Sequence, residues 1–360
     1  MSSLPFKCIV LLEPLGLLYG SSGRLLSPEA LTGQASEHFP PDSPAVAGLL
    51  ASELSRADVI HLFTAGPFWW SSSGDLMLPA PMVLLQETGG DTGRQSRDRL
   101  AWQASNNEQE WSGWWHPAWA DRQGKSPSGG WIRLADWPHP ANSDRAGEVI
   151  AIHDEPWQAV PHLHPKLREN ERVSAVDGAL FLEYGVALQP KVRLAYLSSH
   201  SIPDGTVRFG GEGHLARLSC VAIPHLLEKL LAEKLTAPFA LVTPGLWGGP
   251  KLSIREPIDT TIARGRFPWR REGKPPGILT ERPRPWRYRL GEGSREPRPW
   301  PGERPARRRL SRGRWALPAG SCYHVAGDPL DPWAEWPEVW FPKEGFSLKH
   351  LGTALSLPIV

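Results

Sequence analysis

Short runs in which hydrophobic and polar residues alternate recur along the chain, and this period of two predicts a protein built largely of β-strands. The predicted strands cover residues 6–15, 59–69, 78–86, 131–134, 239–247, 315–325 and the last run of the chain within 345–360. Two alternating runs on either side of Gln189 and Pro190 predict a hairpin. Another pair, TVRF and HLARLSCVA, flanks a group of glycines and predicts a second one.

Two segments have helical spacing instead. In DSPAVAGLLASEL, Asp42 or Ser43 can cap a helix and Pro44 suits its first turn. In IPHLLEKLLAEKL, five leucines fall on one helical face: Leu226, Leu227, Leu230, Leu231 and Leu235. Antiparallel strands with one clear helix in each half favour an α+β fold of two ferredoxin-like (RRM-like, βαββαβ) domains.

Two long insertions interrupt this pattern. Residues 88–161 mix Gly, Pro, Trp and polar residues without a period, and residues 264–314 are rich in Arg, Pro and Gly. The first insertion is predicted to lie in an N-terminal domain, 1–165. The second is predicted to form an extended excursion from a C-terminal domain, 166–360.

The charge is distributed unevenly. The formal net charge is +2, yet residues 264–314 hold 16 arginines and one lysine against five glutamates, a net charge of +12. Trp269, Trp286, Tyr288 and Trp300 lie among these arginines. Arg for phosphates and aromatic rings for stacking is a nucleic-acid-binding composition, and a solvated basic arm is the alternative.

Tryptophan and cysteine add two further indications. Ten of the 18 tryptophans lie between Trp69 and Trp157, where they either stack on bases or sugars or pack beneath long loops. The three cysteines form no CxxC pair, which favours a reducing, cytoplasmic location over a disulfide scaffold. The first 20 residues have no basic region or cleavage signal, so neither a signal peptide nor a membrane span is expected there.

The glycine group in VRFGGEGHLARLS does not match a cofactor-binding loop. A dinucleotide or P-loop glycine run passes from a strand into a helix, whereas Gly210, Gly211 and Gly213 pass into an alternating, strand-like run. A glycine hairpin explains the pattern. A loop that lets RNA approach the backbone, with Arg208, His214 and Arg217 beside it, is the functional alternative.

No catalytic or metal-binding set is evident. His162 and His164 are spaced to lie on one face of a strand, but no third ligand is close in the sequence. No Ser or Cys nucleophile motif and no carboxylate pair are found. The sequence therefore predicts no metal and no cofactor.

Several stretches, in order along the chain, resemble one family. They are LEPLGLLYGSSGR, FPPDSPAVAGLL, GPFWW followed by LPAP, DGALFLEYGVAL, VRFGGEGHLARL, LVTPGLWGGP, LPAGSCYHV and EGFSLKHLG. The series is similar to the RAMP-superfamily subunit three of type III-B (Cmr) CRISPR effector complexes. The resemblance covers both ends and the middle of the chain, whereas residues 264–314 are longer and more basic than the family's usual connection.

The resemblance implies a non-catalytic RNA-binding subunit with two ferredoxin-like domains related to RNA-recognition motifs. Such a subunit holds the 5′ repeat-derived tag of the crRNA. It also bridges the large polymerase-like subunit and the backbone RAMP subunits in antiviral defence. Carried over by position, the implied RNA contacts are Tyr19, Gly20, Ser21, Ser22, Gly23, Arg24, Arg208, Gly210, Gly211, Gly213, His214, Lys349, His350 and Gly352.

Two other functions compete with this one. Related RAMP proteins cut repeat RNA without a metal, so a metal-independent endoribonuclease using His162, His164 and Tyr19 is the enzymatic alternative. A Trp-rich carbohydrate-binding module is the third hypothesis. The Arg-rich segment and the cysteine usage count against that module.

Overall fold

The structure is a computed structural model of the 360-residue chain. It describes residues 4–19, 39–87, 93–103, 113–115, 124–127, 129–138, 148–165, 180–210, 213–247, 255–259, 261, 266–271, 273–290 and 310–359.

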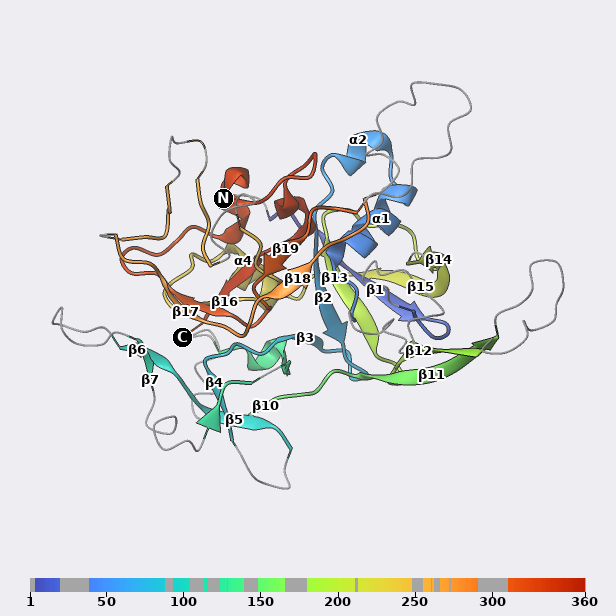
Figure 1. Cartoon of the computed structure of the whole chain (residues 1–360), viewed down its shortest axis with the longest axis horizontal. Helices are drawn as coiled ribbons and strands as arrows, with labels where there is room; N and C mark the ends of the chain where they lie inside the picture. The colour runs from blue at the N-terminus through green and yellow to red at the C-terminus, as the bar shows by residue number, and fades with distance from the viewer. Residues whose placement is uncertain are drawn as a thin grey trace.

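A seven-stranded antiparallel sheet forms the centre of the molecule (Figure 1). Its strand order is β14-β15-β1-β13-β2-β3-β9. The strands are β1 (Cys8–Pro14), β2 (Thr64–Trp70), β3 (Leu76–Pro79), β9 (Trp131–Arg133), β13 (Arg193–Ser198), β14 (Gly205–Phe209) and β15 (His214–Val221). The strands predicted around β1, β2 and β9 and the glycine hairpin β14–β15 are therefore confirmed, whereas the strand predicted over 78–86 divides into β3 and β4 (Leu84–Glu87).

The sheet joins parts of the chain that lie far apart in the sequence. Strand β1 pairs with β13 on one side and with β15 on the other. Helix α1 (Ser43–Glu53) connects β1 to β2, and β13 lies between these two strands, which makes a split βαβ unit. The sheet thus takes strands from both sides of the boundary predicted at residue 165.

Both faces of this sheet are covered. Ile9 and Leu11 of β1 pack on one side with the leucines of α4 (His225–Ala232), whereas Val10 and Leu12 pack on the other side with α1. Side chains alternate between the two faces of a strand, so a strand covered on both faces is hydrophobic at every position. This explains the continuous apolar run CIVLL.

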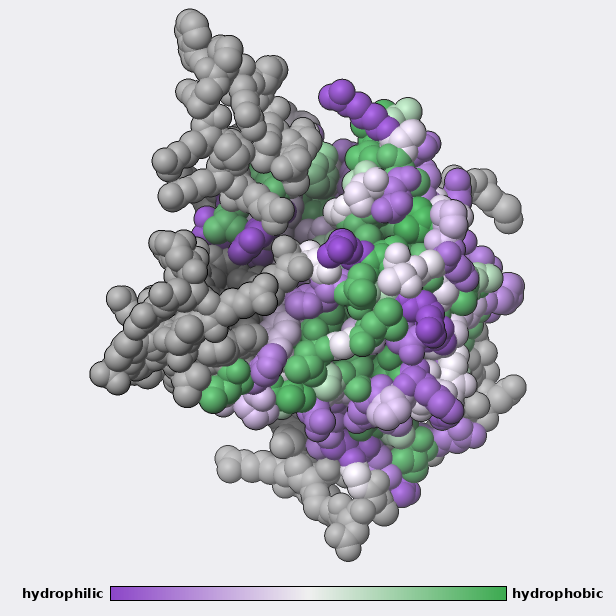
Figure 2. Space-filling view, turned by 90° about the vertical axis from the view of Figure 1, so that its right-hand side faces the viewer, coloured by the Kyte–Doolittle hydropathy of each residue, from purple (hydrophilic) through white to green (hydrophobic). Residues whose placement is uncertain are grey.

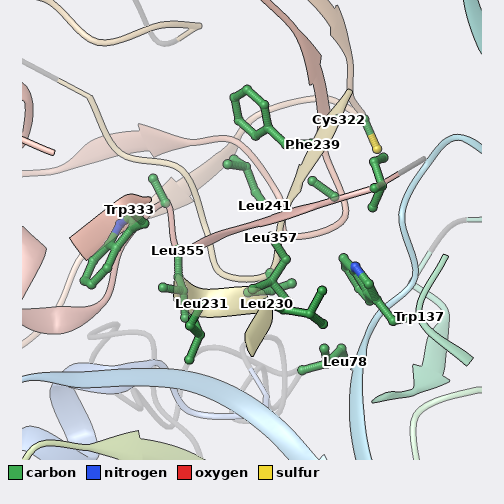
Figure 3. Packing of buried hydrophobic residues seen from close by; sticks show 14 of the residues in the cluster. Leu78, Trp137, Leu230, Leu231, Phe239, Leu241, Cys322, Trp333, Leu355 and Leu357 are labelled. Atoms are coloured by element: carbon green, nitrogen blue, oxygen red, sulfur yellow. The ribbon is translucent and has the colours of Figure 1, made fainter. Parts of the chain in front are cut away.

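The predicted leucine helix links the central sheet to a second one. Its buried leucines are Leu227, Leu230 and Leu231. Figure 3 shows Leu230 and Leu231 between Leu355 and Leu357 on one side and Leu78 of β3 on the other. The second sheet has the order β17-β20-β16-β21, with β16 (Phe239–Leu241), β17 (Gly277–Leu279), β20 (Cys322–His324) and β21 (Ser356–Pro358).

The prediction of a hairpin around Gln189 and Pro190 is wrong. A turn is present there, with the Val192 amide donating to the Gln189 carbonyl at 3.2 Å. However, β12 (Leu180–Leu188) pairs with β11 (Trp157–Pro165), and β13 joins the central sheet. The pattern before and after the turn gave two strands correctly, but it does not encode which neighbour each strand takes.

The two insertions contain more regular structure than the sequence predicts. Within 88–161 the structure describes short strands that pair with each other and with β4 (Leu84–Glu87). These are β5 (Gln95–Arg99), β6 (Ala101–Gln103), β7 (Gly113–Trp115), β8 (Gly124–Lys125) and β10 (Ile150–Ala151). Within and beside 264–314, β18 (Arg284–Trp286) pairs with β19 (Arg314–Ala316). The described parts of both insertions are therefore folded onto the protein.

The remaining elements are short. Helix α2 (Arg56–Val59) follows α1, and the described residues also form 3-10 helices beside β9 and in the second half of the chain. They are η1 (Leu134–Asp136), η4 (Trp333–Glu335), η5 (Glu338–Trp340) and η6 (Leu348–Leu351). Residues predicted as one strand over 315–325 divide into β19 and β20, and those at the end of the chain divide into η6 and β21.

The fold is α+β, with many strands and few helices. In the described part of the chain, only β14 lies between β13 and β15, where a βαββαβ unit would have its second helix. The pair of ferredoxin-like domains therefore stays a prediction. None of the helices in the described ranges is long and apolar enough to cross a membrane.

Candidate functional site

The loop after β1 and the glycine hairpin, which are about 200 residues apart, lie side by side. The Leu15 amide donates to the Leu215 carbonyl at 2.9 Å, directly beyond the last pairs of β1 with β15. The chain then passes β12, where Leu18 and Val186 exchange backbone hydrogen bonds of 3.0 and 2.7 Å. Two of the three segments that the sequence assigned to RNA therefore meet.

Tyr19 lies between two histidines at this junction. A hydrogen bond of 2.6 Å joins the Tyr19 hydroxyl and His162 Nδ1. The Tyr19 ring centroid lies 5.3 Å from that of His214, with 31° between the ring planes. His162 is exposed and the other two side chains are half-buried. The three rings form a partly open aromatic cluster, which we call the Tyr19 cluster.

Gly185 of β12 makes room for this cluster. A Cβ atom at Gly185 would lie 3.0 Å from Leu17 Cδ1 and 3.3 Å from Tyr19 Cζ. A glycine inside a strand commonly marks such a close approach. The signal is visible in the sequence as the glycine of FLEYGVAL, although the predicted site residues do not include Gly185.

The glycine hairpin holds an arginine beside the cluster. Gly210 and Gly213 have φ values of 79° and 69°, and the Gly213 amide donates to the Gly210 carbonyl at 3.2 Å. A Cβ at Gly213 would lie 3.6 Å from Arg208 Nη1, so the guanidinium folds along the turn. Glycine readily adopts these positive φ values and leaves the backbone accessible.

Arg208 and Arg217 differ in their charge environment. Arg217 forms an exposed ion pair of 3.3 Å with Glu13. Arg208 is exposed, and no carboxylate within the described ranges pairs with it. Of the arginines predicted beside the hairpin, Arg208 is thus the one whose charge is available to an anionic ligand.

The surface around the junction is partly apolar. Leu15 and Leu215 are hydrophobic, yet each is 50% exposed to solvent. Figure 2 faces the side of the molecule that carries β14 and β15, and hydrophobic residues reach the surface there between hydrophilic ones. Such a mixed surface suits the apolar faces of bases and the charged phosphates of a nucleic acid.

The third predicted segment lies elsewhere. His350 stacks on Phe63 with 4.1 Å between ring centroids, and a Cβ at Gly352 would lie 2.3 Å from Ala65 Cβ. Thr64, next to Ala65, pairs with Ser198, and Ser198 pairs with Cys8, the first residue of β1. Tyr19 lies five residues after Pro14, the last residue of β1, so the two segments lie beyond opposite ends of a seven-residue strand that spans roughly 20 Å.

Lys349 is buried in this third segment. Its Nζ donates to the carbonyls of Ala334 and Trp336, at 2.7 and 2.5 Å, and lies 5.3 Å from the centroid of the Trp333 ring. Burial lowers the pKa of the Lys349 ammonium to about 8, although Glu338 and Glu335 act in the opposite direction. These contacts give Lys349 a structural role in the described fold.

The remaining predicted site residues are mostly outside the part of the chain that the structure describes. Gly20, Ser21, Ser22, Gly23, Arg24 and Gly211 lie outside the described residues. His164 follows His162 on β11 and is paired through its backbone with Phe181. Within the described ranges, no group of three or more His, Cys, Asp or Glu residues is placed to hold a metal ion.

Most described tryptophans are packed inside the protein. Nine of them are buried: Trp69, Trp114, Trp131, Trp137, Trp247, Trp269, Trp286, Trp333 and Trp336. Trp269 packs edge-on against Trp247, Tyr323 and Trp336, with ring centroids 5.0 to 5.3 Å apart. Packing, and not stacking on a ligand, thus accounts for these nine. Trp315 is different, because 56% of its surface is exposed.

Comparisons with known proteins give structural likenesses only. No protein-family model matches the sequence, and no curated protein matches it. One similar chain comes from the cryo-EM structure of the Type III-B Cmr-beta bound to cognate target RNA, with a TM-score of 0.42 and 14% identity over 88% of this chain and 86% of that chain. Another comes from the Type III-B Cmr-beta bound to cognate target RNA and AMPPnP, state 1, with a TM-score of 0.45 and 12% identity over the same shares.

Proposed function

We propose that this protein is a non-catalytic RNA-binding subunit of a type III-B CRISPR effector complex. In this role it holds the 5′ repeat-derived tag of the crRNA and bridges the large polymerase-like subunit to the backbone subunits. The ordered series of sequence motifs supports the family. The observation that carries the proposal is the junction at Tyr19, because two distant segments with implied RNA contacts meet there.

The chemistry of the junction fits single-stranded RNA. The rings of Tyr19 and His214 offer surfaces on which splayed bases can stack, and Arg208 offers a charge for a phosphate. The positive φ values of Gly210 and Gly213 need glycine, which has no side chain to keep a ligand away from the backbone of the turn. Binding of this kind positions the RNA and requires no metal.

Substitutions at the junction should separate stacking from charge. Tyr19→Ala is expected to weaken binding of tagged RNA roughly 10-fold, whereas Tyr19→Phe, which keeps the ring, should bind like the wild type. Arg208→Gln should weaken binding and reduce the slope of log K against log salt by about 0.7, because one phosphate contact is lost. Titrations at several salt concentrations measure both quantities.

Arg133→Gln is the matched control, since Arg133 lies on β9 at the opposite edge of the central sheet and should leave both quantities unchanged. Each titration is repeated with the same RNA lacking the tag. Equal affinity for tagged and untagged RNA, or unchanged binding by Tyr19→Ala and Arg208→Gln, would contradict the proposal.

The Tyr19 cluster is also compatible with a second function, that of a metal-independent endoribonuclease. Two imidazoles and a phenol in contact are groups that can act as general acid and base on an RNA 2′-hydroxyl and phosphate. Incubation with unprocessed repeat RNA in the presence of a chelator separates the two functions. Site-specific cuts that disappear in His162→Ala, His214→Ala and Tyr19→Phe would favour the enzyme, and intact RNA is the result that we expect.

A further inference from the structure

The ribbon formed by β18 and β19 has one buried and one exposed face. Pro285 is paired with Trp315, and Trp286 with Arg314. Directly paired residues lie on the same face of an antiparallel ribbon, and the next pair lies on the other face. Trp286 is buried with Leu246, Leu348 and Leu351, so Trp315 lies on the face turned towards solvent.

Trp315 is unusual among the tryptophans that the structure describes. Its indole is 56% exposed, whereas Trp286, one strand away, is 4% exposed. The ribbon does not need the Trp315 ring for its packing, because its hydrophobic contacts come from the opposite face. The exposed ring is therefore free to receive a ligand.

Four arginines flank the two strands of this ribbon in the sequence. Arg282, Arg287, Arg289 and Arg312 are exposed, and no carboxylate among the described residues forms an ion pair with any of them. Two neighbouring arginines are neutralised instead: Arg284 by Glu281 at 3.4 Å and Arg314 by Glu344 at 2.5 Å. The ribbon and the residues beside it thus carry four exposed arginines whose charge no described carboxylate offsets.

Hydrogen bonds at Arg287, Tyr288, Ser311 and Arg312 hold the end of the ribbon in place. The Arg287 Nε donates to the Ser311 carbonyl at 3.0 Å, and the Ser311 amide donates to the Tyr288 carbonyl at 2.8 Å. The Arg312 amide donates to Glu344 Oε1 at 3.2 Å. A ribbon fixed in this way presents its charges without a large further loss of chain entropy on binding.

We propose that the exposed face of the β18–β19 ribbon is a second binding surface for single-stranded RNA. The indole of Trp315 stacks on an unpaired base, and Arg282, Arg287, Arg289 and Arg312 contact phosphates. A duplex does not fit, because the faces of its bases are stacked inside it. An acidic protein would pair with the arginines but would offer no base to stack on the Trp315 indole. The choice of RNA over DNA rests on the proposed function, whereas the stacking and the charge do not.

This surface is separate from the Tyr19 cluster. The buried face of the ribbon packs on Leu348 and Leu351 of η6, which lies near the first residue of β1, and Tyr19 follows the last residue of that strand. Substitutions at the two places can therefore be tested independently.

The test measures the affinity of the full-length protein for a labelled single-stranded RNA at several salt concentrations. Trp315→Ala is expected to weaken binding roughly 10-fold and to leave the salt slope unchanged, because it removes stacking only. The double substitution of Arg289→Gln and Arg312→Gln should lower the magnitude of the slope by about 1.4, which corresponds to two lost phosphate contacts. Trp315→Phe should retain most of the affinity.

Ile60→Ala is the control for loss of an exposed hydrophobic side chain, since Ile60 is 66% exposed beside α2. It should bind like the wild type, and the melting temperature of every variant shows whether it is folded. If the ribbon variants bind RNA normally while Tyr19→Ala binds weakly, the second surface is overturned and the proposed function stands. If Trp315→Ala binds RNA weakly while Tyr19→Ala binds it normally, the second surface is supported and the proposed tag site at Tyr19 is overturned.

Discussion

Gly352→Ala is expected to lower the free energy of unfolding by about 3 kcal/mol or more, with no direct effect on an RNA contact. Gly352 has a φ of 63°, in the left-handed region, and ends η6 against β2. An added Cβ would lie 2.3 Å from Ala65 Cβ and 2.5 Å from both Ala65 Cα and the Thr64 carbonyl oxygen. Two of these three atoms belong to the backbone of a central strand, which cannot move aside cheaply. Urea unfolding measures the change.

Gly345→Ala is the matched control for Gly352→Ala. Gly345 has a similar φ of 85°, but no atom lies within 4 Å of its added Cβ. Only the backbone strain remains there, so we expect a loss of about 1 kcal/mol. Equal losses at both positions would show that the contact with β2 is unimportant. A Gly352→Ala protein of normal stability with weakened RNA binding would instead support a direct contact between Gly352 and RNA.

The stability of the wild-type protein should rise between about pH 8 and pH 10, and Lys349→Met should lack this rise. Burial lowers the Lys349 pKa to about 8 from its ordinary value of 10.5. In that interval the unfolded chain binds the proton more tightly than the folded one, so the free energy of unfolding increases with pH. The contribution is complete above the ordinary pKa and is lost as the pH falls through about 8. Its full size is roughly 3 kcal/mol.

Lys343→Met provides the comparison for this pH profile, because Lys343 is an exposed lysine in the same segment. Its substitution should leave the rise in place. The measurement is the midpoint of urea unfolding at a series of pH values for the three proteins. A Lys349→Met profile parallel to that of the wild type would mean that the ammonium of Lys349 is not desolvated in the folded protein.

The strands and the two main helices could be predicted because their signals are local. A run rich in Ile, Val and Leu gives β1, alternation gives β14 and β15, and the spacing of five leucines gives α4. Pairing was less predictable. The run before Gln189 joins β11 and the run after it joins β1, since a turn of suitable composition does not determine which hydrophobic face each strand covers.

The candidate site shows the same division between local and distant information. Sequence motifs identified Tyr19, Arg208 and His214 separately, but only the antiparallel pairing of β1 with β15 brings them together. Lys349 illustrates the opposite outcome. The resemblance alone assigned Lys349 to an RNA-binding loop, and nothing local in the sequence reveals that two carbonyls from residues 334 and 336 bind its ammonium inside the protein.

The position of β1 in the central sheet determines when the protein can finish folding. This strand leaves the ribosome early, but its two neighbours end at residues 198 and 221. Until then CIVLL is a hydrophobic segment of high β-propensity without a partner, the kind of sequence that aggregates or engages chaperones during synthesis. A fragment that stops at residue 165 would contain β1 without either neighbour, so the chain has to be made past its middle before its first strand is protected.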